Sequence, residues 1–393
     1  MKRERIELEI VTPCFLRGAQ QTAEWRAASI RGQLRWWFRA VAGAAYEGDL
    51  QKVRDAEDLL FGSTDRSSLL RIRTSPTPAA VPGSTHFPLG PSLTAAEIAN
   101  LWGERNEATL RRLRLDRDGS RPVHYLGFGP IVGNQLERPY LPPETPVHFE
   151  ILWMRDLEDS NLRLFDQALW AWLHLGGIGG RSRRGFGSLQ KKPFPGDRKA
   201  FIEQARALLK LGREAGRLST EWTCFNAGSR ILVSREACRS WSEAMTWLGA
   251  WLIAFRRRYG YPADSRPGLA NRDYAWAAPK GHLRRDPKRE VPDRAGFGLP
   301  IHFGKLETVT WDASDKEGDA RRASPLLLHV ARLGPSSFLP VLTYLPSTFL
   351  PAGKRLRFKK PPGKPQIPTS NQLGIVDRFL DDLVGKKKIE EVA

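Results

Sequence analysis

The sequence has few cysteines and no apolar run long enough to cross a membrane. The three cysteines, Cys14, Cys224 and Cys238, are scattered over 393 residues and odd in number, which argues against a disulfide framework and against a zinc cluster. No stretch of about 18 apolar residues occurs, and the N-terminus lacks the apolar segment of a signal peptide. We therefore expect a soluble protein of the reducing cytoplasm that makes no membrane contact.

Recognisable catalytic and metal-binding patterns are also missing. The seven histidines show no ligand spacing such as two histidines four residues apart around a glutamate, and there is no nucleophile elbow. The glycine-rich loop at 176–189 lacks the lysine followed by Ser or Thr that marks a nucleotide-binding loop. The sequence therefore predicts a protein that is not an enzyme and that holds no metal or cofactor.

What the sequence has in excess is positive charge. Lys and Arg number 62 against 43 Asp and Glu, which gives a formal net charge of +19. Such a chain is expected to bind polyanions, because neutralised phosphates release condensed counterions. A basic proteome or an assembly with acidic subunits is the alternative explanation. The 13 Trp and 18 Phe indicate a folded protein with apolar cores.

The order of predicted elements indicates an α+β fold with antiparallel sheets. Residues 5–11 and 147–153 alternate polar and apolar side chains, as half-buried strands do. A helix with an apolar stripe is predicted to follow a cap at Ser29 and to run to about residue 46. Another strand is predicted near residues 123–129.

Two domains are expected, because 393 residues exceed what one core usually organises. The first is predicted to span residues 1–217, with an insert at 48–121 and the glycine-rich loop at 176–189. The second is predicted to span 218–393, with a basic insert at 260–294. A strand followed by a long helix opens this second part, which is consistent with a second copy of the first architecture.

Three arginines lie four residues apart on the helix predicted after Ser29. Arg31, Arg35 and Arg39 therefore share one face, where their repulsion is unfavourable unless acidic side chains or an anionic ligand face them. The sequence leaves both alternatives open. Trp36 lies beside this face and off the apolar stripe, so it is a candidate for stacking on a nucleic-acid base.

The glycine-rich loop carries closely spaced arginines. Glycines let a backbone come close to a partner, and guanidinium groups can then converge on phosphate oxygens. The alternative is a tight helix-to-strand connection whose arginines are merely exposed. The candidate RNA-binding residues of the loop are Gly179, Gly180, Arg181, Arg183, Arg184, Gly185 and Gly187.

Two segments resemble a known family. Residues 12–19, followed by Ser29-Ile-Arg-Gly-Gln-Leu-Arg-Trp-Trp-Phe-Arg39, are similar to the N-terminal signature of the first RAMP subunit of Cmr complexes, the type III-B CRISPR effectors. The loop at 176–189 resembles the glycine-rich loop of the RAMP superfamily. Residues 57–63, 296–301 and 322–326 also resemble that subunit, so the similarity covers both halves of the chain.

This resemblance implies two tandem ferredoxin-like (RRM-like) domains with insertions. It implies a non-catalytic, RNA-binding subunit at the head of a ribonucleoprotein, near the 3′ end of the guide RNA, that helps engage target RNA in antiviral defence. The implied partners are guide RNA, single-stranded target RNA and other Cmr subunits. Matching positions for RNA contact are Arg31, Gly32, Arg35, Arg39 and the loop, and the basic insert adds Lys280, Arg284 and Arg285.

A second hypothesis is a metal-independent endoribonuclease that processes guide RNA with a RAMP fold. It needs a general acid–base pair beside the scissile phosphate, for which His174, Tyr46 or Lys280 would have to serve. We expect His174, at the end of an apolar helix, to be structural. A DNA-binding transcription factor is disfavoured because the sequence has no helix-turn-helix or zinc finger pattern.

Overall fold

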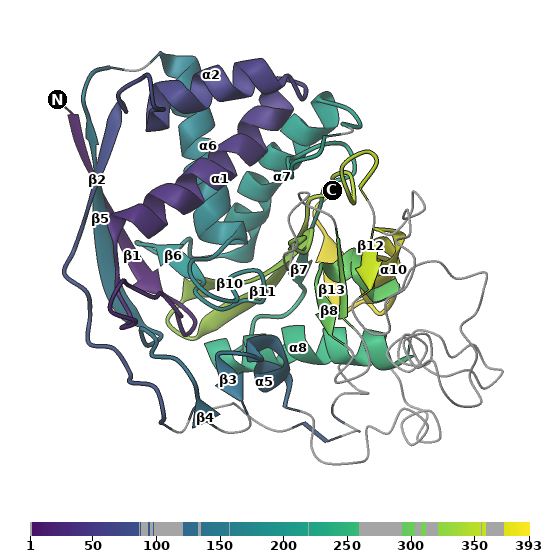
Figure 1. The fold of residues 1–393 in the computed structure, drawn as a ribbon. Coiled ribbons are helices and arrows are strands. Elements are labelled where there is room, and N and C mark those ends of the chain that lie inside the picture. The colour runs from purple at the N-terminus through teal and green to yellow at the C-terminus, as the bar shows by residue number, and fades with distance from the viewer. Residues whose placement is uncertain are drawn as a thin grey trace.

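The protein is built on two four-stranded antiparallel sheets with helices packed around them (Figure 1). The structure is a computed structural model that describes residues 2–85, 87, 93–94, 97, 121–132, 135–156, 158–218, 220–258, 293–302, 308–311, 321–354, 356–358 and 373–393. Lys280, Arg284 and Arg285 lie outside the described residues. The mixed α+β architecture confirms the predicted fold class.

The first sheet has the order β2-β5-β1-β6. Its chain order is β1 (Lys2–Ile10), α1 (Ala27–Ala45), α2 (Leu50–Phe61), β2 (Leu70–Thr74), β5 (Thr145–Trp153), α6 (Asp159–Leu175) and β6 (Leu189–Lys191). Helices α1 and α6 lie side by side on one face of the sheet (Figure 1). The apolar side chains of β1, such as Ile6 and Leu8, are buried beneath them.

The second sheet repeats this order as β10-β11-β7-β13. Its elements are β7 (Arg230–Ser234), α8 (Trp241–Arg258), β10 (Leu326–Gly334), β11 (Ser337–Tyr344), α10 (Gly374–Gly385) and β13 (Ile389–Glu391). Apart from the extra helix α2 in the first half, both halves run strand, helix, strand, strand, helix, strand. The first strand is central in each sheet, which is compatible with the ferredoxin-like arrangement. The domain boundary at 217/218 stays a prediction.

The second sheet is buried on both faces, and the two halves share cores. Along β7, Val233 belongs to the same apolar cluster as the helices of the first half, whereas its neighbour Leu232 belongs to the cluster around α8 and α10. On β10, Leu327 likewise belongs to the cluster of the first half, and Leu328 belongs to the cluster around α8 and α10. Helix α7 (Arg198–Glu214) also contributes to the first cluster. The sheet is thus covered by elements of both halves.

Two local predictions were wrong. Residues 123–129 do not form a strand: Pro122–Gly127 forms helix α5, in which Pro122 suits the first turn and Val123 and Leu126 are buried three residues apart. Ser29 does not cap α1, which begins at Ala27. The Ser29 hydroxyl instead accepts a hydrogen bond from Nε of Arg26 at 3.1 Å.

The remaining described elements are short. They are β3 (Ile131–Val132), β4 (Gln135–Leu136), a 3₁₀ turn (Asp293–Phe297), β8 (Ile301–His302), β9 (Thr308–Trp311) and β12 (Leu356–Phe358). Within the described part of the chain, no helix combines the length and the apolar character needed to cross a membrane.

A buried ion pair joins the two sheets. The guanidinium of Arg332 on β10 contacts the carboxylate of Glu9 on β1, and both residues are less than a tenth exposed. The second oxygen of Glu9 lies 3.1 Å from Nζ of Lys192, and Arg332 Nη2 donates to the carbonyl of Pro335 at 2.9 Å. The pair therefore has the additional partners that buried charges require.

We expect Arg332→Met to lower the free energy of unfolding by about 3–5 kcal/mol, because it leaves the buried Glu9 carboxylate without its main partner. Urea unfolding measures this change. Arg3→Met is the matched control, since Arg3 pairs with Glu150 through a side chain that is 61% exposed. Equal unfolding midpoints for the two variants would contradict the prediction.

Candidate nucleic-acid interface

The glycine-rich loop between α6 and β6 is held on one side by the segment that follows β1. The amide of Gly180 donates to the carbonyl of Phe15 at 2.9 Å, and the amide of Gly187 donates to that of Pro13 at 3.0 Å. The hydroxyl of Thr12 donates to the carbonyl of Gly185 at 2.6 Å. Two of the segments singled out in the sequence, residues 12–19 and 176–189, thus bind each other.

On its other side the loop meets β10, the edge strand of the second sheet. The amide of Leu328 donates to the carbonyl of Arg183 at 3.2 Å, and the amide of Val330 donates to Oγ of Ser188 at 3.1 Å. Nδ1 of His329 lies 2.5 Å from the carbonyl oxygen of Gly176, to which it donates. The loop therefore satisfies hydrogen-bonding groups of a sheet edge that would otherwise be buried without partners.

The glycines of the loop are needed by the fold itself. Gly179, Gly185 and Gly187 have φ of 88°, 85° and 65°, the left-handed region. A Cβ atom at Gly187 would lie 1.9 Å from the carbonyl oxygen of Ile178, and one at Gly179 would lie 2.7 Å from that of Phe15. Close packing within the chain accounts for these glycines without a ligand.

Gly187→Ala is expected to destabilise the protein by well over the 1–2 kcal/mol that left-handed backbone costs an alanine, because its Cβ would also meet backbone. Thermal or urea unfolding gives the difference. Gly196→Ala is the control, since Gly196 has φ of 80° but no atom within 4 Å of the added Cβ. The prediction fails if Gly187→Ala and Gly196→Ala lower the free energy of unfolding by the same amount.

Arg31, Arg35 and Arg39, which share one face of α1, lie next to α2 and its acidic side chains. The carboxylate of Glu57 on α2, whose side chain is 7% exposed, forms ion pairs with Arg35 and Arg39. The guanidinium of Arg31 donates to the carbonyl of Phe61. The sequence left open whether acidic side chains or an anionic ligand face these arginines, and the structure shows an acidic side chain, Glu57, beside two of them.

A second pair of family-like segments also serves the fold. Leu299 and Arg322 exchange backbone hydrogen bonds of 2.8 and 3.1 Å, which joins residues 296–301 to residues 322–326. The Arg322 guanidinium donates to the carbonyl of Phe349 at 2.8 Å and to the hydroxyl of Ser347 at 2.6 Å. Arg322 is therefore committed to contacts within the chain.

Arg183 and Trp36 contact each other between the loop and α1. The Arg183 guanidinium lies 4.9 Å from the centre of the Trp36 ring and donates to the carbonyl of Ser324 at 2.5 Å. Burial, followed by the nearby charge of Arg322, lowers the pKa of Arg183 to about 10. Trp36 is the residue that the sequence indicated for base stacking. Its ring is already covered by the Arg183 guanidinium and also contacts the Trp37 ring edge-to-face.

Among the described residues, none accounts for a glycine at position 32. It lies exposed in the middle of α1, and a Cβ added there would meet nothing within 4 Å. A glycine inside a helix costs about 1 kcal/mol relative to alanine. Gly32 is one helical turn before Trp36, so a ligand beside Trp36 could approach the α1 backbone closely at this point.

Four arginines gather around the tip of the loop, and we call them the arginine cluster: Arg138, Arg181, Arg184 and Arg321. Arg181 is partly covered by its neighbours but still reaches the surface; this partial burial first, and then the charges of the other three, lower its pKa. In the described part of the chain no carboxylate forms an ion pair with Arg138, Arg181 or Arg321, all of which are exposed. Arg138, Arg181 and Arg321 therefore concentrate positive charge at the surface, with no carboxylate partner among the described residues.

Two members of this cluster could not be found from the sequence. Arg138 follows β4 as a single arginine in its segment, and Arg321 precedes β10 beside Arg322, so neither segment is marked as part of a cluster. Only the packing of the loop against both segments brings them to Arg181. One guanidinium nitrogen of Arg181 is also engaged, because it donates to the carbonyl of Phe128.

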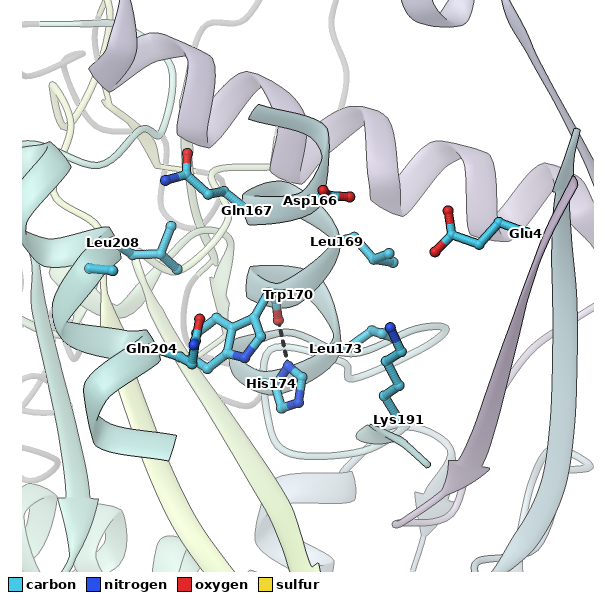
Figure 2. A pocket seen from close by; sticks show the side chains of 11 residues that line it. Glu4, Asp166, Gln167, Leu169, Trp170, Leu173, His174, Lys191, Gln204 and Leu208 are labelled. Carbon is cyan, nitrogen blue, oxygen red and sulfur yellow. Dashed lines mark hydrogen bonds between the residues drawn. The ribbon is translucent and has the colours of Figure 1, made fainter. Parts of the chain in front are cut away.

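His174 lies in the wall of a cavity of about 420 Å³ between α6, α7 and β6 (Figure 2). Its Nδ1 donates to the carbonyl of Trp170 at 2.8 Å, and its Nε2 lies 3.0 Å from the Gln190 amide nitrogen, from which it accepts. Burial lowers the pKa of His174 to about 4. His174 is thus a neutral imidazole with both nitrogens engaged, as expected of a structural residue.

Stability is expected to fall as the pH drops from about 6.5 to about 4. The unfolded chain binds a proton at His174 in this range, whereas the folded protein keeps the imidazole neutral because its pKa is lowered to about 4. His174→Gln should reduce the slope of unfolding free energy against pH by up to about 1.4 kcal/mol per pH unit. Urea unfolding across this range tests the prediction, and parallel curves for the two proteins would refute it.

Comparison with known proteins agrees with the fold and with the loop. Residues 7–190 match the model of the RAMP superfamily. The CRISPR system Cmr subunit Cmr1-1 of Pyrococcus furiosus is 27% identical over 361 residues, which cover 88% of this chain and 89% of that protein. Cmr1-2 of the same organism is 27% identical over 193 residues, 47% of this chain and 92% of that protein.

A solved structure has the same fold. The crystal structure of apo Cmr1 from P. furiosus aligns over 100% of this chain and 99% of that chain, with a TM-score of 0.51 and 21% identity. The RAMP superfamily model thus matches nearly half of the chain, residues 7–190. Over most of its length the chain is similar in sequence to the Cmr1-1 subunit of P. furiosus.

Proposed function

We propose that the chain is a non-catalytic RNA-binding subunit of a type III-B CRISPR (Cmr) effector and that the arginine cluster is its contact with RNA phosphates. Homology to proteins named as Cmr subunits supports the role within such a complex. The gathering of the exposed Arg138, Arg181 and Arg321, which form no ion pair with a described carboxylate, carries the proposal for the contact. The proposed partners are guide RNA, single-stranded target RNA and other Cmr subunits, with this chain at the head near the guide 3′ end.

The chemistry of the cluster suits a phosphate backbone. Guanidinium groups pair with phosphate oxygens through two parallel hydrogen bonds, and they stay charged when partly desolvated. Bringing like charges together is unfavourable without a counter-charge. An anion at this point therefore relieves the repulsion that, after burial, lowers the pKa of Arg181. The net charge of +19 adds long-range attraction for RNA.

In this proposal the loop glycines contribute indirectly, by positioning Arg181, and do not themselves contact RNA. They fix the loop between two sheets, so that Arg181 is presented at a defined point next to Arg138 and Arg321. Arg35 and Arg39 have Glu57 as a partner, which favours a role in fixing α1. Gly32 and Trp36 remain candidates for a second point of RNA contact beside α1, together with Arg183.

Guide-RNA cleavage, the alternative activity, is not supported by the surroundings of His174, its main candidate for a general base. A general base must accept a proton from the attacking group. Nε2 of His174 already accepts from Gln190, and its pKa of about 4 makes it a weak base. Lys280 lies outside the described residues. We therefore propose that RNA is held and not cut by this chain.

Arg181→Ala should weaken binding of single-stranded RNA by roughly tenfold, because it removes a charge-assisted hydrogen bond to phosphate. Replacing Arg138, Arg181 and Arg321 together should also lower the slope of log affinity against log salt by about 2, at roughly 0.7 per phosphate contact. Fluorescence anisotropy over a salt series measures both quantities.

Arg5→Ala is the matched control for these variants, because Arg5 is also exposed but pairs with Glu7 on β1. It should bind RNA as the unaltered protein does. The proposal is abandoned if the triple variant keeps the affinity and the salt slope of the unaltered protein.

A further inference from the structure

Phe128 is a large apolar side chain that the fold leaves in water. It is 61% exposed, whereas the other exposed large hydrophobic residues of the described chain, Leu50, Val132 and Met154, reach 40–46%. A single exposed apolar residue needs no explanation by itself. What sets Phe128 apart is its position, because its own carbonyl accepts the hydrogen bond from Arg181 of the arginine cluster.

The backbone that carries this ring is held in place. Phe128 follows α5 directly, and α5 packs on α8, where a Cβ at Gly249 would lie 2.6 Å from the carbonyl of Pro122. The backbone of Phe128 also forms an isolated β-bridge with that of Ile131, whose side chain is buried. The ring is therefore presented by a braced turn, so little conformational entropy is lost when a ligand binds it.

The surroundings of the ring indicate which kind of ligand it meets. The His124 ring meets Phe128 edge-to-face, with centroids 6.5 Å apart at 84°. On the backbone side lies Arg181, which feels the charges of the other three arginines of the cluster. An apolar ring next to an exposed guanidinium matches a nucleotide, which has a flat base attached to a charged phosphate.

We propose that Phe128 is a stacking platform for one unpaired base of a single-stranded RNA whose phosphates are bound by Arg181 and the arginine cluster. This inference rests on the proposed RNA contact and deepens it. Stacking on an aromatic face does not distinguish one base from another, so the site binds single-stranded RNA without sequence preference. A paired base keeps its faces within the helix, so the site disfavours duplex RNA.

The charge of the neighbourhood argues for RNA over a protein partner at this point. Docking of a protein would place an apolar surface on Phe128 and would have to supply several carboxylates to the cluster as well. Single-stranded RNA supplies a flat apolar group and a negative charge with every nucleotide. Protein docking is nevertheless a distinct outcome of the experiment below.

The test compares full-length protein with Phe128→Ala and Phe128→Trp variants. Three probes are used: a uridine oligonucleotide, an abasic ribose-phosphate oligomer of the same length, and an RNA duplex. Phe128→Ala should weaken binding of the uridine oligonucleotide by about 5- to 150-fold, the range for one base–aromatic stack. Phe128→Trp should restore or exceed the original affinity, because tryptophan keeps the aromatic face.

Two further results are expected if the ring contacts a base. Binding of the abasic oligomer and of the duplex should be the same in Phe128→Ala and in the unaltered protein. The salt slope should not change either, since no phosphate contact is removed. Val132→Ala, which trims another exposed apolar residue of this region, should bind all three probes normally.

Several outcomes overturn the inference. One is unchanged binding of the uridine oligonucleotide by Phe128→Ala, and another is an equal loss for the abasic oligomer. Weaker association of Phe128→Ala with its neighbouring subunits, together with normal RNA binding, would assign the ring to protein docking instead. Failure of the proposed function is distinguishable, because then Arg181→Ala would also bind the abasic oligomer normally.

Discussion

The structure depends on one constraint: two sheet edges meet inside the molecule, and their polar backbone groups must find partners. Strand β6 ends the first sheet and β10 ends the second. The loop that precedes β6 resolves this by hydrogen bonding to the segment after β1 and to β10 at the same time. Because it has to fit between two backbones, it needs glycines such as Gly187, where any side chain would meet a carbonyl. The buried pair of Glu9 and Arg332 ties the same two sheets together with charge.

This arrangement separates two roles that are interleaved in the loop sequence. The glycines and Arg183 bind the protein to itself, whereas the exposed Arg181 lies among like charges at the surface. On α1, Arg35 and Arg39 likewise pair with Glu57, and Arg31 donates to the carbonyl of Phe61. Dense positive charge in the sequence is therefore a poor guide to ligand contact until the internal partners are known.

Much of the architecture could be predicted from periodicity, because the strands over 5–11 and 147–153 and the helix of α6 bury regular stripes. The α5 segment was misjudged as a strand, since Val123 and Leu126 are too few to reveal a helical period in six residues. The site was predictable only in part. Arg181 stands out among its glycines, but Arg138, Arg321 and Phe128 come from separate segments that only tertiary packing brings together.

The joint between loop and β10 also bears on how the protein is made. Arg183 pairs with Leu328, which the ribosome adds 145 residues later. Until that strand emerges, the loop has one of its two supports, and the first sheet keeps an unprotected edge. The contacts of the loop are therefore completed only after β10 has been made, so the surface around Arg181 takes its final form late in synthesis.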